Sequence, residues 1–106
     1  MLIEVKDKDF EKLIPESNEK PIVVYFWAHW ATGSTFFMPK VDRLAHKMHK
    51  NIKFVSIDTE ENKQTIKKYQ IRTIPTVLII KNEEVSHTLT GLINEDHIKE
   101  AVKKHI

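Results

Sequence analysis

The sequence contains no cysteine. Thiolate catalysis, disulfide crosslinks and thiolate-ligated iron–sulfur clusters are therefore excluded. Only 2 glycines and 4 prolines occur, so each of them marks a specific turn or helix boundary. No stretch approaches the roughly 20 apolar residues of a membrane helix, and residues 1–7 lack the apolar core of a signal peptide. We therefore expect a cytoplasmic protein without a membrane partner.

The composition is that of one folded domain. Hydrophobic residues make up 41% of the 106 residues and charged residues 30%, which is enough for one core and a charged surface. The formal net charge is only +2. Lysines are mixed with glutamates over residues 60–68 and 95–104, a pattern typical of solvated helix faces rather than of a nucleic-acid surface. We expect a single domain over residues 1–106 with no nucleic-acid partner.

Apolar periodicity predicts that strands and helices alternate. The run at 22–27 is continuously apolar and rich in β-formers, which indicates a central strand covered on both faces. Asp7 or Asp9 is predicted to cap the first helix, and Pro39 to kink the second. The order β-α-β-α-β-α-β-β-α indicates an α/β protein with a central mixed sheet. The strands are expected at 2–5, 22–27, 53–58, 76–80 and 85–89, and the helices at 7–14, 34–50, 59–70 and from Asn94 onward.

Several motifs, in order along the chain, resemble the thioredoxin family over essentially its whole length. They are Phe26-Trp27-Ala28-His29-Trp30, Pro39, Ile57-Asp58, the segment 69–76 with Ile74-Pro75, and Thr90-Gly91. The resemblance implies the thioredoxin fold, in which helices flank the mixed sheet. It also implies a cis peptide bond before Pro75. In the family this loop faces the active site and offers backbone hydrogen bonds to an extended substrate peptide.

The chain departs from the family at the active site. After the tryptophan the family has Cys-Gly-Pro-Cys, whereas this chain has Ala31, Thr32, Gly33 and Ser34. Thiol–disulfide exchange requires an attacking thiolate and a second thiol, so we expect no catalytic residue and no disulfide oxidoreductase activity.

Two further positions of the family's chemistry are also changed. The family's buried acid aligns with Tyr25, and the lysine that pairs with this acid aligns with Phe54. This combined loss favours a chain released from redox chemistry. The alternative is a thioredoxin, a protein-disulfide oxidoreductase, whose cysteines were lost or replaced in this chain.

The resemblance leaves a peptide groove as the main functional hypothesis. Six residues map around the family's substrate groove: Trp30, Phe36, Ile74, Pro75, Gly91 and Leu92. We expect a protein or peptide partner that pairs with the backbone of Ile74, with Trp30 as the anchor. Trp27 and Phe37 are expected to belong to the core. An exposed aromatic patch leaves both a monomer and a weak homodimer open.

Three other sites are hypotheses from local pattern. Residues 32–35 begin a helix and could hold a small anion through backbone N–H groups, although an ordinary helix cap explains the same residues. Asp42, His46 and His49 recur on one helix face with metal-ligand spacing, but nothing near them in sequence completes a site. His29 lies near Ser34, without a neighbouring acid to orient it. We predict no cofactor and no bound metal.

Overall fold

Five strands form one mixed sheet in the computed structural model, which describes residues 2–106. The strands lie in the order β1-β3-β2-β4-β5. β3 runs parallel to β1 and β2, whereas β4 is antiparallel to β2 and β5. Their bounds are Ile3–Glu4 (β1), Ile22–Trp27 (β2), Lys53–Asp58 (β3), Thr76–Lys81 (β4) and Glu84–Thr90 (β5).

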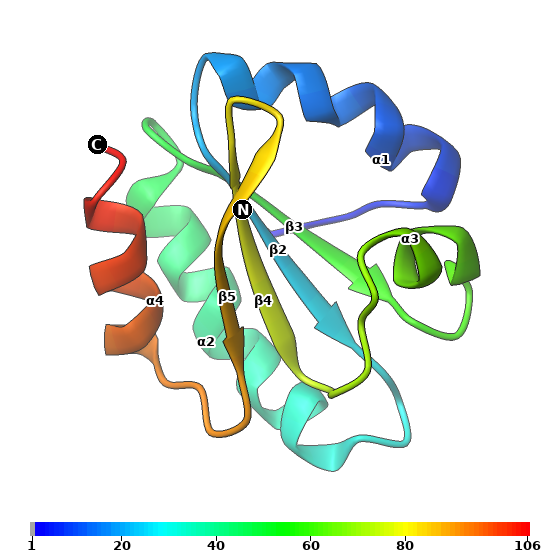
Figure 1. The fold of residues 1–106 in the computed structure, drawn as a ribbon. Coiled ribbons are helices and arrows are strands. Elements are labelled where there is room, and N and C mark those ends of the chain that lie inside the picture. Colours follow the sequence, from blue (N-terminus) through cyan, green and yellow to red (C-terminus); the bar gives the residue numbers. More distant parts are fainter. Residues whose placement is uncertain (1) are drawn as a thin grey trace.

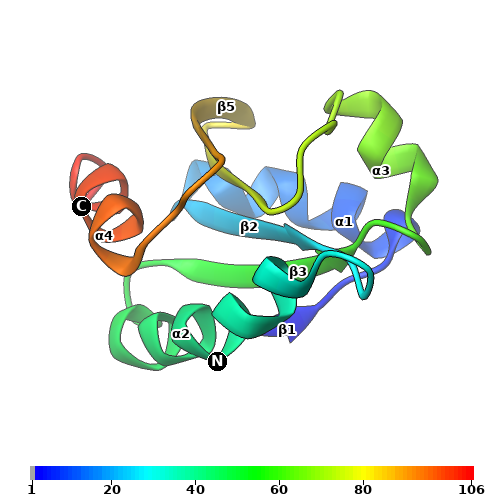
Figure 2. The ribbon, with the colours of Figure 1, turned by 90° about the horizontal axis from the view of Figure 1, so that it is seen from below.

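Helices cover both faces of this sheet. α1 and α3 lie on one face, and α2 and α4 lie on the other (Figures 1 and 2). The α/β architecture predicted from the sequence, a thioredoxin fold with a central mixed sheet, is confirmed. The helices are Asp7–Leu13 (α1), Thr32–Met48 (α2), Lys63–Lys68 (α3) and Glu95–Lys103 (α4), with a short 3-10 helix at Ile14–Asn18.

The side chains of β2 supply both halves of the core. Val23 and Tyr25 pack in the cluster beneath α2 and α4, whereas Ile22, Val24 and Phe26 pack in the cluster beneath α1 and α3. All five are fully buried. Successive side chains of a strand point to opposite faces, so a strand between two helical layers must be apolar at every position. This explains the uninterrupted apolar run.

Some predicted boundaries were wrong by several residues. α2 begins at Thr32 and ends at Met48, and α3 covers only Lys63–Lys68 instead of 59–70. The start of α3 is delayed by a turn built on Asp58. Its carboxylate accepts a hydrogen bond from the Glu60 N–H at 3.0 Å, and the Asn62 side-chain amide donates to its carbonyl at 2.8 Å.

Asp7 was predicted to cap α1, but it does not do so. The N-cap of α1 is Lys6, which makes no side-chain cap. Asp7 instead accepts hydrogen bonds from the N–H and the hydroxyl of Thr65, at 3.0 and 2.6 Å, and from the N–H of Gln64 at 3.2 Å. Burial opposes ionisation, but the hydrogen bonds from Thr65 and Gln64 hold the pKa of Asp7 below its usual value. The carboxylate therefore caps α3 and ties it to α1.

Candidate functional site

The segment between β2 and α2 is where the sequence resemblance predicts the family's active-site motif. Ser34 is fully buried in the first turn of α2. Its hydroxyl accepts a hydrogen bond from the Ala28 N–H at 3.2 Å and lies 3.1 and 2.7 Å from the carbonyl oxygens of Ala28 and Ala31. Ser34 therefore fastens the start of α2 to the end of β2, and its oxygen faces backbone rather than solvent.

Tyr25 and Phe54, which the sequence resemblance matches to the family's acid and lysine, are both aromatic. The Tyr25 side chain is fully buried, and its hydroxyl donates to the Ser34 carbonyl at 2.7 Å. Burial raises the pKa of Tyr25, so the phenol stays neutral. Phe54 is 2% exposed and belongs to the same core cluster. Neither residue carries a charge at neutral pH, and the phenol oxygen has the partner that a buried tyrosine requires.

The structure places an acid beside His29 that sequence reasoning missed. The Nε2 of His29 lies 3.9 Å from the Oδ2 of Asp58, which is buried. This contact could have been predicted from the expected topology. β2 and β3 are parallel neighbours, so the residues at their carboxyl ends meet at one edge of the sheet. The pair does not form a hydrolytic site with Ser34, because the hydroxyl of Ser34 is engaged with backbone.

Exposed apolar side chains surround a pocket of about 290 Å³ beside the start of α2. Leu92 is 98% exposed and Phe36 is 82% exposed. The structure thus brings Phe36, Pro75, Gly91 and Leu92 together around one pocket. Trp30 does not line it, although it is 67% exposed at the same end of the molecule. The lining is Gly33, Phe36, Phe37, Lys40, Pro75, Gly91, Leu92 and Ile93.

Ile74 lies next to this pocket but does not line it. Its side chain is half-buried and packs against the core cluster beneath α1 and α3. The Ile74–Pro75 peptide bond is cis. Within residues 2–106, neither the N–H nor the C=O of Ile74 has a hydrogen-bond partner.

Some of the groups of the anion and metal sites proposed from sequence already have partners within the chain. The N–H groups of Ser34 and Thr35 donate to the Ala31 carbonyl at 2.9 and 3.4 Å, so they belong to the helix. Asp42 lies 3.6 Å from His46, but the Nδ1 of His49 lies 2.9 Å from a backbone carbonyl oxygen. Among residues 2–106, no three or more histidine, aspartate or glutamate side chains lie close enough together to form a set of metal ligands.

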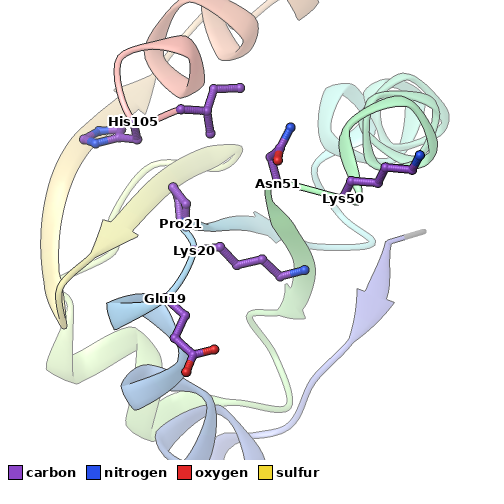
Figure 3. Close-up of a pocket in the computed structure, with 7 residues that line it drawn as sticks. Glu19, Lys20, Pro21, Lys50, Asn51 and His105 are labelled. Carbon is purple, nitrogen blue, oxygen red and sulfur yellow. The ribbon is translucent and has the colours of Figure 1, made fainter.

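A larger pocket of about 790 Å³ lies at the opposite end of the sheet, where β2 and β3 begin (Figure 3). Its walls include Pro21, Asn51 and His105, with Lys20 and Lys50 among the side chains around it. This opening is remote from the segment between β2 and α2.

Of the helices in residues 2–106, none has the length and apolar character to cross a membrane.

Comparisons with known proteins agree with the fold. The thioredoxin of Bacillus subtilis (strain 168) is 31% identical, over 99% of this chain and 98% of that protein. The chloroplastic M-type thioredoxin of Pisum sativum is 36% identical, over 96% of this chain and 59% of that protein. The structure of Fasciola hepatica thioredoxin superposes with a TM-score of 0.89 at 30% identity, and covers 100% of both chains.

Reduced Schistosoma mansoni thioredoxin gives a similar result, with a TM-score of 0.90 at 32% identity over 99% of this chain and 98% of that one. The sequence profile described as Thioredoxin matches residues 1–104. Agreement in sequence and in structure thus extends from one end of the chain to the other. The chain belongs to the thioredoxin family.

Proposed function

We propose that the chain is a redox-inactive thioredoxin-like domain that binds an extended segment of a partner protein. The observation that carries the proposal is the pair of exposed side chains, Phe36 and Leu92, on the pocket beside Pro75. Redox inactivity is supported by the absence of cysteine and by the aromatic residues at the two relay positions, Tyr25 and Phe54.

The apolar anchors set the expected strength of binding. Full burial of one large apolar side chain contributes about 1.5–3 kcal/mol. Burial of Trp30, Phe36 and Leu92 together would thus contribute roughly 5–9 kcal/mol before the partner segment is ordered. Because ordering that segment opposes binding, we expect a dissociation constant of about 1 μM or weaker.

The backbone and one charge define the chemistry of the partner. An extended segment can pair with the N–H and C=O of Ile74 by strand addition, which needs no particular partner sequence. Lys40 is the one charged residue among the eight that line the pocket. We therefore expect the bound segment to carry an apolar side chain with an acidic residue close by.

Affinity capture from a lysate of the source cell tests the proposal with three baits. The first is the unchanged chain, and the second carries Trp30→Ala, Phe36→Ala and Leu92→Ala. The third is a matched control in which three exposed apolar residues elsewhere, Ile3, Val85 and Ile106, are changed to alanine. All six positions are exposed, so circular dichroism is expected to show the same fold for every bait.

The result expected is a protein recovered by the unchanged chain and by the control but lost by the groove variant. Its binding region, made as a synthetic peptide, should then bind the purified chain and perturb the amide signals around Ile74. Recovery of the same proteins by all three baits would exclude the groove as the binding site.

A further inference from the structure

A second cluster of polar side chains lies on the opposite side of the molecule from Trp30, between β5 and the segment after α4. The Nε2 of His105 lies 3.0 Å from the Oγ of Ser86 and 3.2 Å from the Nδ1 of His87. The third edge of this triangle, from Ser86 Oγ to His87 Nδ1, is 3.4 Å. Figure 3 shows the His105 imidazole at the rim of the large pocket, beside the ribbon of β5.

A β-bulge explains how neighbouring residues of one strand meet. Adjacent side chains of a regular strand point to opposite faces of the sheet. Here Ile79 pairs with His87 and Ile80 pairs with Val85, so Ser86 is the extra residue of β5. A bulge redirects side chains locally, and it brings the Ser86 hydroxyl to the side on which His87 lies.

The hydrogen bonds of the cluster leave lone pairs of Ser86, His87 and His105 that point toward one another. The Ser86 hydroxyl donates to the Ile79 carbonyl at 3.0 Å, so the lone pairs of its oxygen are left to face the two imidazoles. A neutral imidazole has one N–H and one bare nitrogen. A single proton can therefore lie between His87 Nδ1 and His105 Nε2. The Ser86 oxygen and the two imidazole nitrogens thus surround a position that one proton occupies.

Two lysines near His105, Lys81 and Lys104, oppose the binding of a cation. Solvent and salt screen charges at the surface, so this repulsion is weak. Metal ions bind the neutral form of imidazole.

We propose that Ser86, His87 and His105 bind a divalent transition-metal ion, with Zn²⁺ as the representative case. Two nitrogens at about 2.0–2.1 Å from a tetrahedral zinc ion lie about 3.3 Å apart, and the two imidazole nitrogens are already 3.2 Å apart. The ion would take the place of the proton between the two nitrogens, and that proton moves to the other ring nitrogen of the imidazole that carries it. Water completes the coordination. Imidazole donors select zinc, copper or nickel over magnesium and calcium.

A second pair of possible metal ligands in the same chain supplies the matched control. Asp42 and His46 on α2 lie 3.6 Å apart, so they also offer two donor atoms. Zinc titration of the whole chain, followed by NMR of the histidine rings, distinguishes the two sites. We expect the ring signals of His87 and His105 to change first and to saturate at one ion per chain.

Substitutions give the quantitative test. His87→Gln or His105→Gln is expected to weaken zinc binding at least about tenfold, because the loss of an outer-shell partner alone weakens metal sites about 10–100-fold. His46→Gln is expected to leave the affinity unchanged, and Ser86→Ala to reduce it less than either imidazole change.

Two results would overturn the proposal. One is saturation of the His46 ring before those of His87 and His105. The other is zinc affinity that survives both His87→Gln and His105→Gln in folded protein. The glutamine variants keep a polar side chain at half-buried positions, so thermal unfolding without zinc is expected to match that of the unchanged chain.

Discussion

Replacing Tyr25 with aspartate would introduce the buried acid that the resemblance to the thioredoxin family matches to this position. The Tyr25 ring is fully buried in the core beneath α2 and α4, where it lies 6.1 Å from the ring of Phe37. Its hydroxyl donates to the carbonyl of Ser34. The substitution therefore removes a large apolar contact and a hydrogen bond, and it places a carboxyl group in an apolar environment.

The magnitude follows from these three changes. Truncation of a buried aromatic side chain lowers the free energy of unfolding by about 3–5 kcal/mol. The aspartate refills part of the space, but burying its carboxyl adds about 1–3 kcal/mol. We expect a net loss of roughly 4–6 kcal/mol at pH 7, which is a large part of the 5–15 kcal/mol typical of a domain.

The loss should depend on pH in a defined direction. Burial raises the pKa of the new carboxyl above its unfolded value of about 3.9. The charge penalty is therefore absent below the unfolded pKa, grows as the pH rises, and is complete above the raised folded pKa. The variant should recover part of its stability, relative to the unchanged chain, between pH 7 and pH 4.

Urea unfolding at both pH values measures the effect. Tyr25→Phe is the control, because it loses only the hydrogen bond to Ser34 and should be about 1 kcal/mol less stable at either pH. A Tyr25→Asp variant within about 1 kcal/mol of the unchanged chain at pH 7 would refute the reasoning. Such a result would mean that the core still accommodates the acid of a working thioredoxin.

Three further changes test other parts of the structure. Asp7→Asn should lower the free energy of unfolding by about 1 kcal/mol at pH 7, because neutral hydrogen bonds replace charge-assisted ones to Thr65 and Gln64. Urea unfolding should show this difference vanish as the pH falls through the lowered pKa of Asp7, and a difference that persists at low pH would contradict the role of the charge. Glu83→Gly should raise the unfolding temperature, because Glu83 has a φ of 64° and relief of this left-handed conformation, worth about 1–2 kcal/mol, exceeds the entropic cost of glycine of about 0.5–1 kcal/mol. A lower temperature would show that its 2.7 Å hydrogen bond from Asn18 matters more. Ala31→Cys combined with Ser34→Cys should supply two thiols at the start of α2. We expect this variant to reduce insulin about 100-fold more slowly than a thioredoxin, because Tyr25 and Phe54 supply no acid–base group. A rate equal to that of thioredoxin would contradict this account.

Local patterns in the sequence predicted the centre of the fold well. The apolar run at 22–27 can be buried on both faces only between two helical layers, so β2 was predictable from its own residues. Asn94 was similarly predictable as the cap of α4, and it accepts a hydrogen bond from the His97 N–H at 2.9 Å. In both cases the residues that determine the structure lie within a few positions of each other.

The parts that the sequence did not predict depend on distant partners. Asp7 binds Thr65, which is 58 residues away, and nothing near Asp7 distinguishes this from an ordinary cap of α1. His29 meets Asp58 only because β2 and β3 are parallel neighbours. Among the proposed metal ligands, Ser86 and His87 meet through a bulge that leaves no clear mark in the composition, and His105 comes from 18 residues further along the chain.

The same bulge has a consequence for the behaviour of the protein at high concentration. An open sheet has two edge strands, and a long regular edge is a template on which another chain can aggregate. β1 contributes only two residues, Ile3–Glu4, to one edge, and Ser86 interrupts the regular spacing of backbone groups along β5 at the other. Neither edge offers a long uninterrupted row of backbone donors and acceptors, so aggregation by sheet extension is disfavoured without any disulfide or covering helix.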